Sequence, residues 1–443
     1  MKYEFLLCVA SAFALVAAAI PVFDGVDDPS RPVMDAARAS IERIRKDDFH
    51  VTLLDPSGKP VAGQVHVHLA RHEFRFGADL YGFPALPPVA RKQAEAVVDQ
   101  LFNTVILINY WRKPDFDSTD QMLAFAREHH KIPRFHALLY NVPLSFSQTG
   151  SDGDRWKMIE DRIRTIAKRY GNQVHEYDVL NEIAADKWLW ENHLDSAFFA
   201  DAANGARCFR IARQYLADAE LLNTDATIAA TNSTALTPIL DYSRALLAAG
   251  APIDVIGHQA HFFASGSMPF QQGHARYGGP GAFTMKMIDG GLDRLAALGK
   301  PVHITEFSPP SRDKKRKGSQ PSLTDDEIAA WQVNYYTLAF SKPYVHEITR
   351  WFIIDGLGGR GLDAGLITTD GKLKPAYYAI KRLLKETWST DWRGPAVHGT
   401  VSFRGFFGDY DVEADGYEPA TLSARSTASR SISLTLAPIK VKR

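Results

Sequence analysis

Residues 175–182 have the sequence His-Glu-Tyr-Asp-Val-Leu-Asn-Glu, and this stretch decides how the rest of the chain is interpreted. Its first seven residues predict a short strand, which follows an amphipathic helical pattern at 156–170. The strand ends in two polar residues, Asn181 and Glu182. Polar side chains at the carboxyl end of a strand, next to helical segments, are typical of a parallel α/β barrel, whose site lies at that end.

The same alternation of strand and helix continues on both sides of this stretch. The predicted strands are 74–80, 102–109, 134–140, 175–181, 227–231, 254–261, 301–307 and 347–354. The predicted helices between them are 90–100, 120–129, 156–170, 197–218, 239–249, 285–298 and 328–341. Eight strands that alternate with helices predict an α/β fold of the (β/α)8, or TIM, barrel type. A doubly wound open sheet is the alternative, but no glycine-rich fingerprint follows the first strand.

Two β-rich segments flank the predicted barrel. At 49–76 apolar residues alternate around the turn Asp55-Pro56-Ser57-Gly58, which predicts a β-hairpin. After Leu384 the alternation returns in three runs, 397–407, 410–414 and 431–437. Because each segment alone has too few strands for a core, we expect the two to form one accessory module. The expected boundaries are 40–76 for the hairpin segment, 77–390 for the barrel and 391–443 for the C-terminal β segment.

The composition is that of a globular protein without a preference for polyanions. Of 443 residues, 45% are hydrophobic and 23% are charged, which excludes wholesale disorder and fibrous architectures. The 51 basic residues balance the 51 acidic ones, so nucleic acid is not an expected ligand. Aromatic residues make up 11%, which provides surfaces on which sugar rings can stack.

The N-terminus has the pattern of a targeting segment. Lys2 precedes an apolar run at 5–20, and three alanines from Ala17 provide an A-x-A-like cleavage site, so residues 1–20 are a predicted signal peptide. A transmembrane anchor is the alternative, but the run is slightly short for a span. Cleavage would leave Cys208 as the single cysteine, hence no internal disulfide. The mature chain is expected to be secreted or periplasmic, without stable membrane insertion.

Polar and aromatic residues gather at the ends of the predicted strands. Glu306 ends the seventh strand as Glu182 ends the fourth. Two glutamates at a barrel mouth are what hydrolysis of a glycosidic bond requires, because one carboxyl protonates the leaving oxygen while the other attacks the anomeric carbon or activates water. The other candidates at strand ends are His136, Asn181, His258, Gln259, His261 and Trp351.

Five segments then resemble, in order, the signature stretches of glycoside hydrolase family 10, the endo-β-1,4-xylanase family. They are FHALLY at 135–140, YDVLNE at 177–182, IGHQAH at 256–261, VHITEF at 302–307 and KPAY at 374–377, which are similar to the family's GHTLVW, WDVVNE, GIGxQxH, ITE and KPAY. Order and spacing agree along about 70–390. The resemblance implies an enzyme that cleaves a β-1,4-linked polysaccharide or oligosaccharide, xylan or a related β-glycan, and needs no cofactor or metal.

The resemblance also implies a retaining mechanism. Glu182 would be the acid/base and Glu306 the nucleophile, with their carboxyls about 5–5.5 Å apart. Asn181 would bond the 2-hydroxyl of the reacting sugar. The residues that line the subsite of this sugar would be His136, Gln259, His261 and, beneath the ring, Trp351.

The chain departs from the family pattern near the ends of the second and third predicted strands. Where the family has Glu-Asn followed by Lys, this chain has Ile108, Asn109 and then Arg112 or Lys113. Ile108 cannot accept a hydrogen bond, so recognition beyond the reacting sugar is expected to differ. The remaining candidate substrate contacts in these two segments are Asn109, Arg112, Lys113, Tyr140 and Asn141, the last two in place of a Trp-His pair.

Two further departures follow the predicted catalytic residues. Ser308 stands where an acidic residue usually holds the histidine of strand six. Trp188 and Trp190 lie just past Glu182 and are candidates either for a replacement stacking platform or for aromatic anchors of the loop.

Two other classes of function fit part of the pattern. A metal-dependent barrel hydrolase would use histidines and an aspartate, and the candidates are His66, His68, His258, His261 and Asp355. However, His66 and His68 precede the first barrel strand. A non-catalytic carbohydrate-binding barrel would keep the aromatic residues and lose a glutamate, whereas both glutamates are present. The sequence implies no particular oligomeric state.

Overall fold

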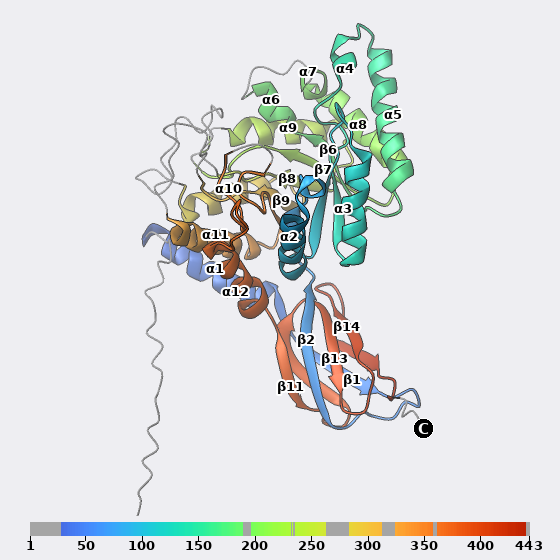
Figure 1. Ribbon diagram of the computed structural model, residues 1–443, viewed down its shortest axis with the longest axis vertical. Helices are drawn as coiled ribbons and strands as arrows, with labels where there is room; N and C mark the ends of the chain where they lie inside the picture. Colours follow the sequence, from blue (N-terminus) through green and yellow to red (C-terminus); the bar gives the residue numbers. More distant parts are fainter. Residues whose placement is uncertain are drawn as a thin grey trace, which may run out of the picture.

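A helix-wrapped barrel and a β-sandwich below it make up the part of the chain that the computed structural model describes (Figure 1). That part comprises residues 28–188, 196–231, 233, 235–262, 283–311, 324–357 and 361–439. The predicted signal peptide, Trp190 and the side chain of Trp188 lie outside the described residues. No helix in these ranges is both long and apolar enough to cross a bilayer.

The barrel is closed, and its strands follow one another around the wall in sequence order. The strands are β3 (Arg75–Asp79), β4 (Thr104–Ile108), β5 (Ile132–His136), β6 (Glu176–Asn181), β7 (Glu220–Asp225), β8 (Val255–His258), β9 (Val302–Phe307) and β10 (Val345–Arg350). All neighbouring pairs are parallel, including β10 with β3, which closes the ring. The predicted (β/α)8 barrel is therefore confirmed.

Helices cover the outside of this barrel, as Figure 1 shows. The longer ones are α2 (Pro88–Leu101), α3 (Phe116–Glu128), α5 (Asp152–Tyr170), α8 (Ala202–Tyr215), α9 (Leu236–Ala248), α10 (Met285–Ala296), α11 (Asp325–Phe340) and α12 (Pro375–Arg382). The shorter ones are α4 (Leu144–Gln148), α6 (Ile183–Trp188) and α7 (Ser196–Ala200). Side chains define several starts: Thr324 and Glu327 form a capping box at α11, and Ser151 caps α5.

The fifth strand lies earlier than predicted. It is β7, whereas the predicted strand at 227–231 forms no regular element. Inside the barrel wall, the hydroxyl of Thr224 donates to Asp178, and the carboxylate of Asp225 accepts from the N–H of Ala184. Because these positions are polar, β7 lacks the apolar pattern from which strands are predicted. The predicted helix at 197–218 is likewise divided into α7 and α8.

The sandwich is built from both ends of the chain, as predicted. One sheet contains β12 (Thr400–Phe406), β1 (Lys46–Leu54) and β15 (Ser431–Thr435), and the other contains β11 (Asp391–Pro395), β2 (Gln64–His72), β13 (Gly408–Ala414) and β14 (Ala420–Ala424). Their inner faces meet at a buried aromatic group, in which Phe49, Phe403 and Tyr410 have ring centroids 5.3–6.4 Å apart. These contacts make the two terminal segments one folded unit.

The predicted hairpin at 49–76, however, is wrong. The turn itself forms, since the backbone N–H of Asp55 donates to the carbonyl of Lys59 at 2.8 Å. Beyond the turn the chain crosses to the opposite sheet, so β1 and β2 do not pair with each other. Both strands direct apolar residues between the sheets, and their partners come from the distant C-terminal segment. A local pattern of alternation cannot distinguish this arrangement from a hairpin.

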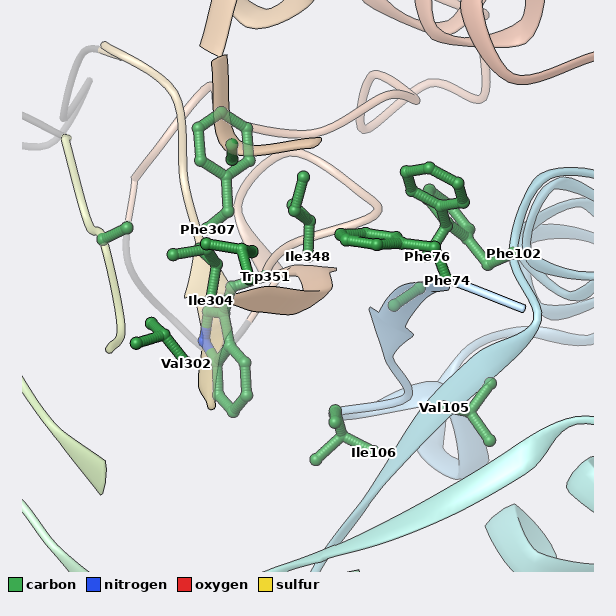
Figure 2. Close-up of a cluster of buried hydrophobic side chains, with 14 of the residues drawn as sticks. Phe74, Phe76, Phe102, Val105, Ile106, Val302, Ile304, Phe307, Ile348 and Trp351 are labelled. Carbon is green, nitrogen blue, oxygen red and sulfur yellow. The ribbon is translucent and has the colours of Figure 1, made fainter. Parts of the chain in front are cut away.

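Aromatic side chains and one helix join the sandwich to the base of the barrel. Phe340 at the end of α11 contacts Phe74, Trp388 and Phe406, with centroids 4.4–6.2 Å apart. Figure 2 shows part of the adjoining core of buried apolar side chains, which lie on the barrel strands and directly beside their ends. Helix α1 (Arg31–Ile44), which was not predicted, ends at Arg45, whose guanidinium donates to three backbone carbonyls in the segment that leads from α11 into β10. The junction therefore lies at the base of the barrel and does not cover the mouth at the opposite end.

Candidate active site

Glu182 directly follows β6 and has a left-handed backbone, with φ of 60°. This conformation is unfavourable for a residue with a Cβ atom, and its neighbours hold it in place. The backbone N–H of Glu182 donates to the carbonyl of Thr224 at 3.0 Å. The carboxylate of Asp225 accepts hydrogen bonds from the N–H groups of Ala184 and Ala185, at 2.8 and 3.1 Å, and so fixes the start of α6. The turn between strand and helix places the Glu182 carboxyl at the mouth.

The Glu182 carboxyl receives one hydrogen bond on each oxygen. Gln259 donates to Oε1 at 2.8 Å, and the hydroxyl of Tyr140 donates to Oε2 at 3.0 Å. Burial raises the pKa of Glu182, and the negative charge of Glu306 raises it further, while these two hydrogen bonds oppose the shift. The net effect favours a carboxyl that keeps its proton to higher pH than usual.

Glu306 lies on β9 and is only 3% exposed. Its Oε2 is 3.1 Å from Nε2 of His261, whose Nδ1 is 3.0 Å from the hydroxyl of Ser308. Its Oε1 lies 3.7 Å from Nε2 of His136 and has no hydrogen bond within the described part of the chain. One oxygen is therefore fixed by an imidazole, and the other keeps its lone pairs for a different partner.

His136 is held in place from behind by Asp178, which was not among the predicted site residues. Its Nδ1 is 2.6 Å from the Asp178 carboxylate, which also accepts from Arg134 and Thr224, at 2.9 Å each. Burial lowers the pKa of His136, but the charges of Glu306 and Asp178 outweigh it and leave the pKa raised. Asp178 thus orients the ring so that Nε2 faces Glu306. The signal for it was its place inside the strand that ends in Glu182.

Two polar atoms beside Glu182 are buried and lack partners. Asn181 accepts from Gln259 at 3.2 Å, but its own Nδ2 has no hydrogen bond among the described residues, and neither does Oε1 of Gln259. Buried polar groups are normally paired. A donor and an acceptor left open next to a carboxyl form a site for hydroxyl groups.

Aromatic rings complete the mouth. Trp351, 7% exposed, stacks against Tyr81 with a centroid distance of 6.5 Å and meets His136 and His261 edge-on at 5.6 and 6.4 Å. Tyr110 contacts His136 and Tyr140 at 5.9 and 5.3 Å. The two tyrosines Tyr81 and Tyr110 were missed, although each comes just after a predicted strand.

Asn109, a predicted substrate contact, has partners for its amide within the chain. Its amide is buried and engaged at both ends, since Nδ2 donates to Thr119 and Oδ1 accepts from Arg162, at 2.9 Å each. Arg112, Lys113 and Asn141 are exposed. Arg112 donates through Nε to the carbonyl of Val142 at 2.8 Å. Ile108 is buried at the end of β4, as its apolar character requires.

A further carboxyl, Asp79, ends β3 and was not predicted as a site residue. It is fully buried, 0% exposed. Burial raises the pKa of Asp79 well above its usual range; the backbone of Phe352 and the charge of Arg350 oppose this shift, and the charge of Glu306 adds to it. The raised pKa favours the protonated form of Asp79, a carboxyl that feels the charge of the nucleophile candidate Glu306.

The metal-hydrolase pattern does not assemble at the mouth. His258 accepts the backbone N–H of Ala229 at 3.3 Å, and Asp355 is paired with Lys374 at 3.1 Å. His66 and His68 lie in the sandwich, on β2. The residues proposed for one metal centre are therefore separated.

One buried group with metal-type donors does occur inside the barrel, where Glu176, His303 and Glu347 lie close together. Guanidinium groups already neutralise it, since Arg75 is 2.6 Å from Glu176 and Arg134 is 3.5 Å from Glu347. This arrangement is an internal ion network that supports the barrel wall, so a cation is not required there.

Comparison with known proteins identifies a family and several similar chains. The family model for Glycosyl hydrolase family 10 matches residues 93–383. Anti-sigma-I factor RsgI6 of Acetivibrio thermocellus is 22% identical over 396 residues, which cover 86% of this chain and 46% of that protein. Endo-1,4-beta-xylanase C of Paenibacillus barcinonensis is 25% identical over 300 residues, 60% of this chain and 26% of that protein. The chain thus spans less than half the length of these two relatives.

Solved structures share the fold. Native xylanase 10B from Thermotoga maritima superimposes with a TM-score of 0.57 at 21% identity, covering 71% of this chain and 96% of that one. Xylanase 10B from Thermotoga petrophila, solved in complex with xylobiose, gives a TM-score of 0.56 at 21% identity, with coverage of 71% and 95%. The shared part is the size of the barrel.

Proposed function

The chain belongs to glycosyl hydrolase family 10, and on that premise we propose that it hydrolyses β-1,4 linkages of xylan or a related β-glycan by double displacement at Glu182 and Glu306. One observation carries the proposal. A carboxyl with a raised pKa, Glu182, stands at the same barrel mouth as a second carboxyl, Glu306, of which only one oxygen is held by an imidazole. This pairing of an acid with a carboxylate is what glycosidic bond cleavage needs.

In the first step, Glu306 attacks the anomeric carbon while the bond to the leaving oxygen breaks. Glu182 gives its proton to that oxygen, so the leaving sugar departs as a neutral alcohol. The product of this step is a sugar joined to Glu306 through an ester bond. In the second step, the Glu182 carboxylate takes a proton from water, whose oxygen attacks the same carbon and releases Glu306. Two inversions leave the configuration retained.

The surrounding residues supply positioning and electrostatic support. His261 and His136 face the two oxygens of Glu306 and reduce its freedom to rotate. The open Nδ2 of Asn181 and Oε1 of Gln259 are suited to hydroxyl groups of the reacting sugar, and such contacts can strengthen as charge develops. Trp351 supplies an apolar surface for the ring.

Support for xylan as the substrate comes from relatives. Endo-1,4-beta-xylanases recur among them, and one solved relative was crystallised with xylobiose. The experiment is a screen of the purified chain against xylan, mixed-linkage β-glucan and cellulose, with product sizes measured over time. Early release of oligosaccharides of mixed length from xylan supports endo cleavage. Absence of reducing ends from every β-glycan would contradict the proposal.

A second candidate is carbohydrate binding without turnover. Its support is the relative named as an anti-sigma factor, whose similarity covers 86% of this chain and so extends beyond the residues that the family model matches. Binding of xylo-oligosaccharide in calorimetry, with no product after long incubation, would favour this candidate over hydrolysis.

We also propose that the chain is exported after cleavage near residue 20, on the strength of the N-terminal sequence pattern. N-terminal sequencing of protein recovered from the culture medium or periplasm tests this directly. A mature protein that starts at Met1 would contradict it.

A further inference from the structure

The outer face of the four-stranded sheet carries two histidines and an aspartate from strands that are far apart in sequence. His66 and His68 lie on β2, two residues apart, so they share one face of the strand. Asp391 begins β11, which pairs antiparallel with β2 and places Asp391 opposite His68. We propose that His66, His68 and Asp391 bind a divalent transition-metal ion such as Zn²⁺, at a site separate from the barrel mouth.

The donor atoms are already close to the spacing that zinc requires. Nε2 of His66 is 3.0 Å from Oδ1 of Asp391, and Nδ1 of His68 is 3.6 Å from Oδ2 of the same residue. One donor atom from each residue lies within 4.8 Å of the others. Tetrahedral zinc with bonds of about 2.0–2.1 Å has ligand atoms about 3.3 Å apart, so small side-chain rotations suffice. Imidazole nitrogen and carboxylate oxygen are both ordinary zinc ligands.

A second carboxylate orients His66 from behind. Glu413 lies on β13, opposite His66 in the strand register, and its Oε2 is 3.5 Å from Nδ1 of His66. A carboxylate that accepts the Nδ1–H leaves the lone pair of Nε2 pointing toward Asp391. Metal-binding histidines commonly have such a carboxylate on the ring nitrogen that does not bind the metal.

The nitrogen of His68 that faces Asp391 lacks a hydrogen bond among the described residues. Nδ1 of His68 is buried and makes no hydrogen bond within the described part of the chain, although the ring itself is partly exposed. Oδ2 of Asp391 lies 3.6 Å from this nitrogen, which is beyond hydrogen-bond distance. A metal ion between the two would give both a partner. This open nitrogen is an independent indication of a ligand.

The charges around the cluster also favour a cation. Asp411 lies two residues before Glu413 on β13 and pairs in register with His68, so a further acid is on this face. Arg393 approaches Oδ1 of Asp391 at 3.6 Å, but it is 71% exposed and can turn into solvent. The metal-free alternative is a set of direct contacts between the two histidines and Asp391, and the experiment below distinguishes the two.

A bound ion would link the start of the C-terminal segment to the strand that leads into the barrel. β11 follows the last helical segment of the barrel, and β2 precedes β3. The expected consequence is a more stable sandwich, because an ion that binds only the folded state shifts the unfolding equilibrium toward it. Hydrolysis at the mouth should not depend on the ion.

The test is a titration of the full chain, freed of metal by chelator and dialysis, with Zn²⁺ in calorimetry at pH 7.5. We expect one ion per chain, with a melting midpoint that rises with zinc concentration. Co²⁺ in its place should give the visible absorption of a tetrahedral site. Failure to bind a stoichiometric ion would overturn the proposal, and so would a midpoint unaffected by zinc.

Matched variants locate the ion. His66→Ala and Asp391→Asn should each weaken zinc affinity at least tenfold, whereas His50→Ala should leave it unchanged. His50 is exposed on β1 in the other sheet and contacts Ser402, so it controls for loss of any surface histidine. Equal affinity in the wild type and both site variants would place the ion elsewhere and contradict the assignment. Asp391→Asn keeps the side-chain shape, so an effect on folding is not expected to obscure the result.

Discussion

Gln259 donates a hydrogen bond of 2.8 Å to Oε1 of Glu182, and this contact joins the end of β8 to the end of β6 at the centre of the mouth. The same amide nitrogen of Gln259 also donates to Oδ1 of Asn181 at 3.2 Å. Oε1 of Gln259 has no hydrogen bond among the described residues. Three residues from two predicted strand ends, Asn181, Glu182 and Gln259, therefore form one connected unit. This unit positions the proton that the proposed reaction transfers.

Replacing Glu182, the proposed proton donor, should lower the rates on different substrates by different factors. Glu182→Ala should lower kcat/KM on xylan by about 10²–10⁴-fold, because loss of a general acid costs roughly that much. An activated aryl glycoside needs no protonation of its leaving group, so its first step should be affected far less. Steady-state kinetics on both substrates check this, and equal losses on the two would argue against the role of Glu182.

The pH profile should report the same proton. Since burial and Glu306 raise the pKa of Glu182, the acid stays protonated to higher pH and kcat/KM should fall as pH rises through that pKa. The basic limb should be absent in Glu182→Ala with the activated substrate. A basic limb that persists unchanged in the variant would assign it to another group.

Asp79 provides a prediction about stability. Its pKa is raised in the folded state, so the unfolded chain loses this proton first and the wild type loses stability as pH rises from about 4 toward the folded pKa. Asp79→Asn has no proton to lose and escapes this effect. The difference in melting midpoint between variant and wild type should therefore shift in favour of the variant when the pH rises from 4 to 8. A difference that stays constant between the two pH values would contradict a raised pKa for Asp79 in the folded state.

Ser308 should act through His261. Its hydroxyl is 3.0 Å from Nδ1 of His261, and the loss of one such hydrogen bond costs about 1 kcal/mol, so Ser308→Ala should lower kcat about fivefold. Ser311→Ala is the matched control, because Ser311 is buried three residues further on and its hydroxyl has no hydrogen bond among the described residues. Similar kinetics for the two variants would show that Ser308 does not position the histidine.

Phe403 tests whether the sandwich stabilises the protein as a whole. Its ring is 5% exposed and lies 5.5 Å from Phe49, so Phe403→Ala should destabilise folding by about 3–5 kcal/mol. Urea unfolding gives this value, while kcat at low temperature should change little because the barrel mouth is distant. If barrel unfolding, followed by tryptophan fluorescence, keeps its midpoint, the sandwich is an independent appendage.

The sequence predicted the features that depend on local order. Glu182 and Glu306 were recognisable because each ends an apolar strand, and the barrel because strands and helices alternate. The strand β7 was misplaced because its polar residues serve contacts inside the wall, including the carboxylate of Asp225 at the start of α6. Its pattern therefore does not resemble that of an ordinary buried strand.

Features that depend on distant partners could not be predicted in this way. Whether β1 pairs with β2 is decided by residues some 350 positions later, such as Val401 opposite Val51. Asn109 shows the same limit, since only the fold reveals that Arg162 and Thr119 occupy its amide. The proposed zinc site also needs Asp391 beside His66, which no local spacing indicates.

The most direct test of the central claim is the activity of Glu306→Ala with and without azide. Without azide, hydrolysis should fall by several orders of magnitude while circular dichroism stays native, because the residue supplies the covalent bond and not the fold. With azide and an activated aryl β-glycoside, turnover should partly return and the product should be the α-glycosyl azide, since a single displacement inverts the anomeric carbon. A variant that remains within about tenfold of wild type without azide would contradict Glu306 as the nucleophile.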